Sequence, residues 1–299
     1  MGKSIAMGKA SRAKQDVHRR ERVASQRAAE RRAQFRSRVL LASGAIVVVI
    51  AVVVALIVIK TGSNTAKPAG NGPTGAALAS VVSDTTSVPA PALDAVGAGS
   101  VTAKPASVSG PPLTSGGKPE MLYMGAEYCP YCAFERWGMI VALSRFGTFS
   151  GLHTVRSSST DVYPNTPTYT FHGSAYTSKY LTFTPVEETT NIPQGNSYTP
   201  LQKPTPQQQA LMARYDPGLS IPFVDIGNKY TIVGASASPQ VLDGKSWAAI
   251  AASLKDASSP VAQAVDGTAN YITAAICKLT NDQPASACTP TVRSLQSKM

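Results

Sequence analysis

The longest uninterrupted apolar stretch of the chain covers residues 39–59, which are 21 residues without a charge. A helix rises 1.5 Å per residue, so this stretch would span roughly 30 Å, the thickness of the hydrocarbon core of a bilayer. A cleaved signal peptide usually has a shorter apolar region that lies nearer to the start of the chain. We therefore expect an uncleaved transmembrane helix over residues 39–59.

The segments on either side of this helix are polar and lack the apolar pattern of a folded core. Residues 1–38 carry twelve Lys and Arg against three acidic residues, whereas only Lys60 and Lys67 follow soon after the apolar stretch. The positive-inside rule then places the N-terminus in the cytoplasm and the rest of the chain outside. Residues 60–117 are rich in Gly, Ala, Pro, Ser and Thr with almost no large apolar residue, which predicts a flexible stalk.

From about Lys118 the hydrophobic pattern becomes that of a folded α/β domain. Residues 121–126 form a short apolar run of the kind that makes a buried strand. Four large apolar residues then recur at helical spacing within residues 133–146: Phe134, Trp137, Ile140 and Val141. A second strand fits residues 152–156.

Residues 157–200 are rich in Thr, Tyr, Ser and Pro and read as an insertion with hairpin character. Two of its pieces have β-forming composition: Thr168–His172 and Tyr180–Thr184. We expect a domain over residues 118–256 that contains this insertion, and a C-terminal helical extension over residues 257–299.

Capping and turn signals divide the second half of the domain. Three of them each begin a predicted helix: Thr205-Pro206 (to about Tyr215), Ser246 (to Leu254) and Ser259-Pro260 (to about Leu279). Two short apolar runs flank the turn-like Gly227-Asn228, which predicts a β-hairpin. Gly267 predicts a break in the last helix, because glycine is a weak helix former.

The net charge of +11 adds one constraint, since +9 of it belongs to residues 1–38. We interpret this segment as a basic cytoplasmic tail that lies next to anionic lipid head groups. Nucleic-acid binding is not expected, because no aromatic stacking platform accompanies the basic residues.

The candidate chemistry lies in Cys129-Pro130-Tyr131-Cys132, between the predicted strand and helix. The first cysteine falls at the helix N-terminus, where free N–H groups and the helix dipole favour a thiolate, so its pKa should fall. The second cysteine, one turn on, can attack a mixed disulfide formed by the first. An inert structural disulfide is the alternative, although closing so short a loop removes little unfolded-chain entropy.

Cys277 and Cys288 are the other two cysteines, and they flank a polar turn. We expect a structural disulfide here, with a second redox pair that relays electrons to the first as the alternative. A four-cysteine zinc site is not expected, because ten residues lie between this pair rather than two. His153 and His172 also lack metal-ligand spacing, so no metal is expected. We interpret Arg136 as a solvated helix residue, with support of the thiolate as the alternative.

The order strand, Cys-Pro-Tyr-Cys, helix, strand, insertion, helix, Pro-led strand, hairpin strand and helix resembles the thioredoxin fold over about residues 118–256. Pro130-Tyr131 is similar to the glutaredoxin dipeptide, and Ile221-Pro222 resembles the cis-proline loop of that superfamily. The resemblance implies that Cys129 is the attacking thiol, Cys132 the resolving thiol and Ile221-Pro222 the substrate-docking loop. Through GAEYCPYCAFERW and the late cysteine pair, the chain also resembles an uncharacterised membrane-anchored thioredoxin-like family of unknown function.

Together these features predict a thioredoxin-like three-layer α/β fold with an insertion, preceded by one transmembrane helix and a stalk. The expected function is that of an extracytoplasmic, membrane-anchored thiol–disulfide oxidoreductase that acts on protein disulfides or thiols. No cofactor is expected, since the dithiol carries both electrons, and a membrane redox partner would reset it. The sequence leaves open whether it is an oxidase, an isomerase or a reductase. The alternative is a non-catalytic extracytoplasmic binding module with two structural disulfides.

Overall fold

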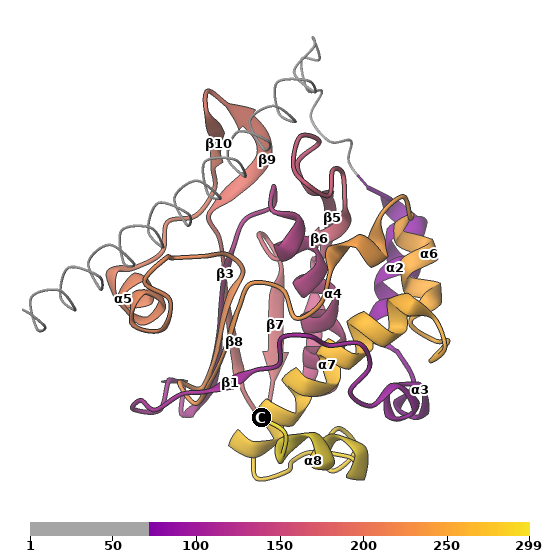
Figure 1. Ribbon diagram of the computed structural model, residues 1–299, viewed down its shortest axis with the longest axis vertical. Helices are drawn as coiled ribbons and strands as arrows, with labels where there is room; N and C mark the ends of the chain where they lie inside the picture. The colour runs from indigo at the N-terminus through magenta and orange to yellow at the C-terminus, as the bar shows by residue number, and fades with distance from the viewer. Residues whose placement is uncertain (1–71) are drawn as a thin grey trace, which may run out of the picture. The chain divides into compact units, whose positions relative to one another are not determined.

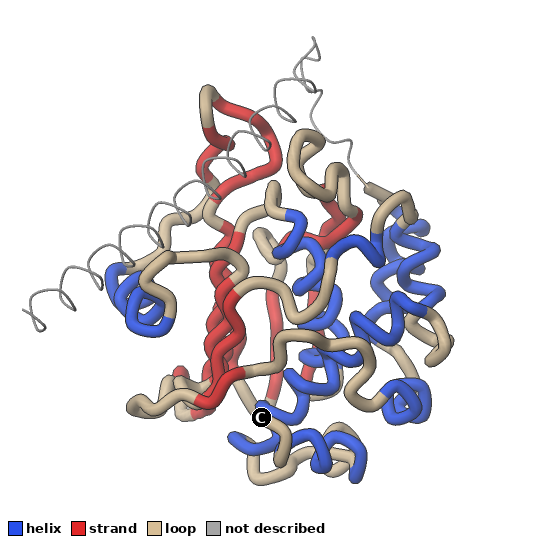
Figure 2. Tube along the Cα trace, in the orientation of Figure 1, coloured by secondary structure: helices blue, strands red, loops and turns tan. Residues whose placement is uncertain are grey.

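A computed structural model of the chain describes residues 72–299 (Figure 1). The basic tail and the transmembrane helix expected over residues 1–38 and 39–59 lie outside the described residues. Among residues 72–299, no helix combines the length and the apolar character needed to cross a membrane. The described part has a mixed α/β architecture, in which runs of strands are separated by helices and the chain ends in helices (Figure 2).

A six-stranded sheet forms the centre of the described part. Its strands are β1 (Ala106–Ser107), β2 (Thr114–Ser115), β3 (Lys118–Gly125), β8 (Thr182–Glu187), β11 (Phe223–Ile226) and β12 (Tyr230–Val233). Strand β3 is central, since it pairs in parallel with β8 and antiparallel with β11. Strand β12 pairs antiparallel with β11, and β1 lies beyond it at the edge. The β11–β12 hairpin predicted around Gly227-Asn228 is confirmed.

Seven α-helices occur within residues 72–299: α2 (Gly75–Thr86), α3 (Ala90–Val96), α4 (Pro130–Ser144), α5 (Pro206–Tyr215), α6 (Trp247–Ser253), α7 (Pro260–Leu279) and α8 (Pro290–Gln296). The capping signals predicted the starts of α5, α6 and α7 correctly. Thr205 makes a complete capping box with Gln208 before α5, and the Ser246 side chain accepts a hydrogen bond from the backbone N–H of Ala249 before α6.

Side chains of β3 alternate between two apolar cores, as the pleat of a strand requires. Leu122 and Met124 pack in a small core with Met212 of α5. Met121 and Tyr123 belong to the larger core on the other face, which includes residues of α4 and α7. The sheet therefore lies between α5 on one side and α4 and α7 on the other (Figure 1).

The stalk predicted over residues 60–117 is wrong from residue 72 onward. Helix α2 packs on α4 and α6, and helix α3 packs on α7. Leu93 of α3 is buried, and the Thr85 hydroxyl of α2 lies 2.7 Å from the hydroxyl oxygen of Tyr169. Small Ala, Ser and Thr side chains let these helices approach their neighbours closely, so few large apolar residues were needed for burial.

The insertion predicted over residues 157–200 has different boundaries in the structure, because β8 lies inside this range and belongs to the main sheet, where it pairs with β3. The strand predicted over residues 152–156 exists, but it belongs to a small sheet of its own. The inserted strands form two antiparallel pairs between α4 and β8: β4 (Gly147–Ser150) with β7 (Ala175–Ser178), and β5 (His153–Arg156) with β6 (Pro167–Thr170). A second hairpin follows β8 and consists of β9 (Thr189–Gln194) and β10 (Ser197–Pro200).

The predicted boundary between a domain at 118–256 and an extension at 257–299 is also wrong, because α7 is an integral part of the larger core. Sixteen of its residues are buried, and it packs along α4. The break predicted at Gly267 is absent, and α7 is continuous. A Cβ at this position would lie 2.7 Å from the carbonyl oxygen of Ala98, so glycine here allows close packing with the segment after α3.

Candidate functional site

Cys129 and Cys132 lie at the junction between β3 and α4. Cys129 is the N-cap residue of α4, and Pro130 occupies the first helical position, where a missing N–H costs nothing. The sulfur of Cys129 accepts a hydrogen bond from the backbone N–H of Cys132 at 3.3 Å. Both cysteines are free thiols. The fold thus places the Cys129 sulfur where the first N–H groups of α4 converge.

The two thiols have opposite acid–base character. The pKa of Cys129 is lowered, chiefly by the hydrogen bond that it accepts from the Cys132 thiol. Burial opposes this effect, whereas the backbone N–H groups of Cys132 and Tyr131 and the charge of Arg136 add to it. Burial raises the pKa of Cys132 well above its ordinary value, as do its hydrogen bond to Cys129 and the charge of that neighbour. Cys129 is therefore the thiol that ionises first.

Exposure separates the two cysteines in the same order. Cys129 is 5% exposed and Cys132 is 0% exposed. A disulfide partner from solution can reach the first sulfur only at this narrow opening, and the second sulfur only after the first has reacted.

The Ile221-Pro222 loop lies against the Cys129 sulfur, although 92 residues separate Cys129 from Ile221 in the sequence. The Cys129 thiol donates a hydrogen bond to the Ile221 carbonyl, with a sulfur-to-oxygen distance of 3.8 Å. The Ile221–Pro222 peptide bond is cis. Pro222 immediately precedes β11, so the strand that pairs with β3 also carries this loop to the cysteines.

A buried ion pair lies behind the cysteines. Arg136 of α4 and Glu187 at the end of β8 are both 0% exposed, and the guanidinium binds the carboxylate through two hydrogen bonds of 2.8 and 2.6 Å. The interpretation of Arg136 as a solvated residue is therefore wrong. Glu187 also accepts a hydrogen bond from the backbone N–H of Phe171, so its carboxylate has three donors.

Tyr123 connects this ion pair to Cys132. The Arg136 guanidinium carbon lies 5.7 Å from the centre of the Tyr123 ring. A Cβ on Gly125 would lie 2.1 Å from the Tyr123 hydroxyl and 3.1 Å from the Cys132 sulfur. Only glycine at this position therefore lets both groups pack against the backbone of Gly125. The Tyr123 hydroxyl and the Nη1 atom of Arg136 are buried and make no hydrogen bond within residues 72–299.

Two further carboxyl groups near the motif in sequence have different surroundings. Burial raises the pKa of Glu127, which lies on the loop between β3 and α4. Burial also raises the pKa of Glu135 to about 7, and this residue accepts hydrogen bonds from the backbone N–H and the hydroxyl of Ser236. Glu135 therefore ties α4 to the segment after β12.

Aromatic side chains surround the opening at Cys129. Tyr131, between the two cysteines, is 40% exposed and contacts the Tyr163 ring edge-on at 6.0 Å. Tyr128 stacks on Tyr198 of β10 at 4.2 Å. The loop between β5 and β6 and the β9–β10 hairpin thus supply aromatic partners to the two tyrosines next to the cysteines.

Cys277 and Cys288 form a disulfide between the end of α7 and the segment before α8. Both are buried. Their sulfurs lie close to Asp282 in the only grouping of potential metal ligands among residues 72–299, but sulfurs that are bonded to each other offer no thiolate to a metal. The described part of the chain therefore has no thiolate-ligated metal centre at this pair.

The comparisons with known proteins give one similarity. Residues 104–198 match a family model described as a domain of unknown function (DUF929). The matched segment is about a third of the chain and includes Cys129 and Cys132, but it ends before Ile221. Neither a curated protein nor a solved structure matches the chain.

Sequence reasoning brought Cys129, Cys132 and the Ile221-Pro222 loop together, and it missed Tyr123 and Glu187. Glu187 lies 51 residues beyond Arg136, in a segment that the sequence assigned to an insertion rather than to the main sheet. The available signal was the charged Arg136 within an otherwise apolar helix, since a charge that is buried there requires a partner.

Proposed function

We propose that this chain is an extracytoplasmic, membrane-anchored thiol–disulfide oxidoreductase with a thioredoxin-like fold. The observation that carries the proposal is the asymmetry of the two free thiols: Cys129 caps α4 with a lowered pKa, and Cys132 is fully buried with a raised one. Such a pair suits a reaction in which one thiol reacts with the substrate and the other resolves the product.

The reaction begins with the Cys129 thiolate attacking one sulfur of a substrate disulfide. A bond forms between Cys129 and that sulfur, the substrate S–S bond breaks, and the second substrate sulfur leaves as a thiolate that takes a proton from solvent. Cys132 then loses its proton and attacks the Cys129 sulfur, which releases the remaining substrate thiolate. Two electrons have passed to the substrate, and Cys129 and Cys132 are left as a disulfide.

The same steps in reverse oxidise a substrate dithiol. A membrane redox partner that exchanges dithiol for disulfide would return the pair to its starting state, and no cofactor is required. The direction of electron flow depends on how strongly the reduced thiolate is stabilised, because lowering the pKa of the attacking thiol favours the reduced pair.

The strand order and helix placement support the thioredoxin-like part of the proposal. Strands β8, β3, β11 and β12 are neighbours in that order, with β3 and β8 parallel and the other two pairs antiparallel. The helix that carries the cysteines connects β3 to β8 through the inserted strands. The cis Ile221–Pro222 bond before β11 also agrees with the loop that the sequence resemblance implies.

The membrane anchor and the location outside the cytoplasm are further parts of the proposal. They are supported by the 21 uncharged residues at 39–59 and by the excess of Lys and Arg before them. A disulfide between Cys277 and Cys288 suits an oxidising compartment. Substrates would then be proteins that gain or exchange disulfides outside the cytoplasm.

The experiment compares two single variants of the full-length chain, kept in a non-ionic detergent. Each is incubated with a peptide that contains one disulfide, and the products are resolved by mass spectrometry without reductant. Cys132→Ser should accumulate a mixed disulfide at Cys129, because the resolving thiol is missing. Cys129→Ser should accumulate none, because its remaining thiol is buried. Equal trapping by both variants, or none by either, would refute the proposal and leave the binding module.

A further inference from the structure

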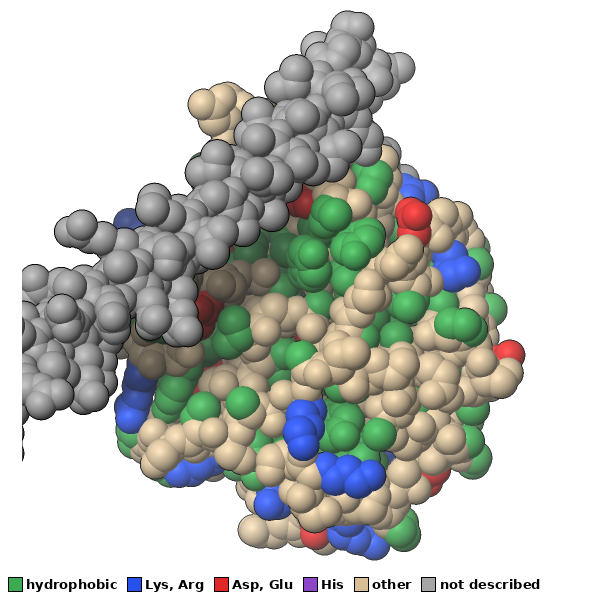
Figure 3. All heavy atoms as spheres, in the orientation of Figure 1, with side chains coloured by type: hydrophobic (Ala, Val, Ile, Leu, Met, Phe, Trp, Pro, Cys, Tyr) green, Lys and Arg blue, Asp and Glu red, His purple; other side chains and the backbone are tan. Residues whose placement is uncertain are grey.

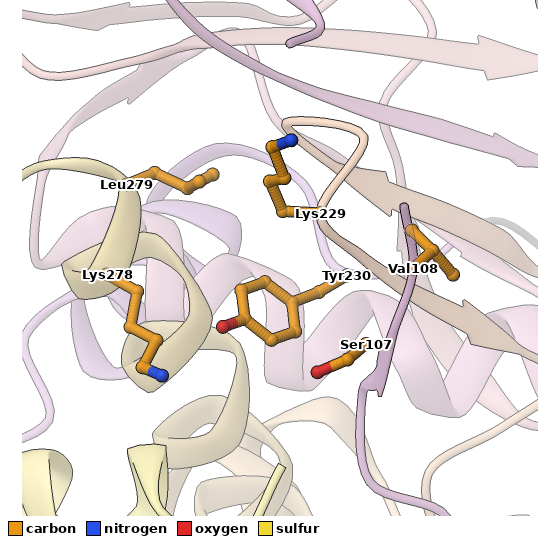
Figure 4. Close-up of a pocket in the computed structure, with 6 residues that line it drawn as sticks. All are labelled: Ser107, Val108, Lys229, Tyr230, Lys278 and Leu279. Carbon is orange, nitrogen blue, oxygen red and sulfur yellow. The ribbon is translucent and has the colours of Figure 1, made fainter. Parts of the chain in front are cut away.

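A hollow of the surface has a lining that includes neither Cys129, Cys132 nor the Ile221-Pro222 loop. It has a volume of about 470 Å³ and lies between edge strand β1, the start of β12 and the last turn of α7 (Figure 4). Its lining consists of Ser107, Val108, Lys229, Tyr230, Lys278 and Leu279. Four of these six side chains have hydrogen-bond donors, two of them are cationic, and none is acidic, so the hollow has the polarity of an anion site.

The backbone brings these donors together by strand pairing and by a turn. Ser107 of β1 is the direct cross-strand partner of Tyr230 in β12, and directly opposed residues present their side chains on the same face of a sheet. The Val108 N–H also donates to the Lys229 carbonyl at 2.8 Å, which extends this pairing by one residue. Ser107 and Tyr230 therefore keep a fixed spacing on the rim.

The end of α7 is held against the same hairpin. A Cβ on Gly227, in the turn between β11 and β12, would lie 2.5 Å from a methyl carbon of Leu279. Gly227 also has a φ of +66°, which a residue with a side chain rarely adopts. Two separate reasons, the positive φ and the contact with Leu279, thus require glycine at position 227. The contact between Leu279 and the turn places Lys278 beside Tyr230.

The polar groups in the hollow are available to a ligand. Within residues 72–299 the Tyr230 hydroxyl, the Ser107 hydroxyl and the Lys278 ammonium make no hydrogen bond or ion pair, although Tyr230 as a whole is only 8% exposed. Figure 4 shows the Tyr230 hydroxyl directed toward Lys278 and the Ser107 hydroxyl below the Tyr230 ring. Lys229 lies at the opposite end, where its ammonium points away from Tyr230 and donates to the Gly110 carbonyl at 2.8 Å, so it contributes charge but no donor.

From this convergence we infer that the hollow binds an oxyanion, a phosphate or carboxylate group of a small molecule or polymer. Tyr230, Ser107 and Lys278 would donate hydrogen bonds to its oxygens, and Lys229 would add a second positive charge. Hydrogen bonds between charged partners are about twice as strong as neutral ones, so the lysine contacts should carry most of the affinity. Val108 and Leu279 are the apolar walls beside the group that carries the anion.

Two features of the chain agree with this assignment. Lys and Arg side chains gather on the lower part of the face seen in Figure 3, below the region of apolar side chains on the same face. Lys278 lies in the last turn of α7, where a cation also interacts favourably with the helix dipole. The interaction with the helix dipole accounts for Lys278 alone. It does not explain why the Tyr230 and Ser107 hydroxyl groups and Lys229 line the same hollow.

The test is a calorimetric titration of the full-length chain, in non-ionic detergent and at constant ionic strength, with inorganic phosphate and separately with acetate. Phosphate should bind more tightly, because it offers more oxygens to the three donors and more charge to the two lysines. Lys278→Gln should weaken phosphate binding by about tenfold or more, and Tyr230→Phe by about three- to tenfold. Lys278→Arg should bind within about threefold of the parent, because it keeps the charge and a donor.

Lys203→Gln is the matched control, since Lys203 is exposed, undergoes the same charge change and does not line the hollow. It should leave phosphate binding unchanged. If acetate binds as tightly as phosphate and shows the same dependence on Lys278, the natural ligand carries a carboxylate. The inference is overturned if the parent binds neither anion, or if Lys278→Gln has no larger effect than Lys203→Gln. If Lys278→Gln does not fold, Ser107→Ala and Tyr230→Phe decide the question in the same way.

The outcome of the anion titration is independent of the redox proposal. The titration follows anion binding and needs no reaction of Cys129 or Cys132. A chain that binds phosphate but traps no mixed disulfide would retain the site and lose the proposed activity, and the opposite result would retain the activity and lose the site.

Discussion

Replacing Glu187 by glutamine would remove the only carboxylate among residues 72–299 that pairs with the fully buried Arg136. The guanidinium and the carboxylate are both 0% exposed and are joined by two hydrogen bonds. Neither group can therefore be solvated by water when its partner is lost. Breaking a buried ion pair by removing one partner typically destabilises a protein by about 3–5 kcal/mol. For a folded region of this size that corresponds to a fall in melting temperature of about 6–20 °C.

The assay is thermal unfolding of the full-length parent and variant, followed by circular dichroism in the same detergent. Glu188→Gln is the matched control, because Glu188 is the next residue, undergoes the same chemical change and makes no ion pair within the described part of the chain. This control should lower the free energy of unfolding far less than Glu187→Gln, because Glu188 is only half-buried and the change breaks no buried ion pair.

Removing both charges should restore much of the loss. In the double variant Arg136→Met/Glu187→Leu, no buried charge remains, and well-packed apolar replacements of buried ion pairs are often neutral or stabilising. If Glu187→Gln is as stable as the Glu188→Gln control, the buried pair is not a structural support of the site and the reasoning is refuted. If the double variant is no more stable than Glu187→Gln, the cost lies in packing rather than in the unpaired charge.

Three further outcomes follow from the described residues. Tyr123→Phe should stabilise the fold by about 1–2 kcal/mol in denaturant unfolding, because it removes a buried hydroxyl without a hydrogen-bond partner; a loss of stability would mean that this hydroxyl is satisfied. Cys277→Ser/Cys288→Ser should lower the free energy of unfolding by about 3 kcal/mol, because the disulfide closes a loop over a sequence separation of 11. The alkylation rate of Cys129 should stay unchanged, and a changed rate would favour an electron relay. Burial raises the pKa of Asp266 from 3.8 to about 8, so the folded state binds this proton more tightly than the unfolded state. The stability from this proton is complete below about pH 4 and is lost as the pH rises through about 8, so Asp266→Asn should flatten the decline in melting temperature over that window; an equally steep decline in parent and variant would contradict the assignment.

The parts of the fold that sequence predicted are those whose signals are local. Thr205-Pro206 predicted the start of α5, and Gly227-Asn228 predicted the β11–β12 turn. The start of α4 at Pro130 also follows from residues next to it. In each case a backbone requirement and the residue that meets it lie within a few positions of each other.

The parts that were missed depend on long-range contacts. Strand β8 overlaps the β-forming piece predicted over Tyr180–Thr184, but its place in the main sheet depends on its pairing with β3 along six residue pairs. Helices α2 and α3 have the small residues of a linker and are helical where they pack on α4, α6 and α7. Pro222 could be assigned to the site only through the resemblance, since nothing local in the sequence brings it to Cys129.

The reduction potential of the Cys129–Cys132 pair tests the proposed function most directly. The full-length chain, in detergent, is equilibrated in glutathione buffers, the oxidised fraction is counted by alkylation and mass spectrometry, and circular dichroism follows the fold in the same samples. A reversible two-electron couple between roughly −270 and −120 mV, with the fold intact in both states, is the predicted result. A pair that cannot be oxidised and reduced without unfolding the protein would contradict the oxidoreductase and leave a structural cysteine pair in a binding module.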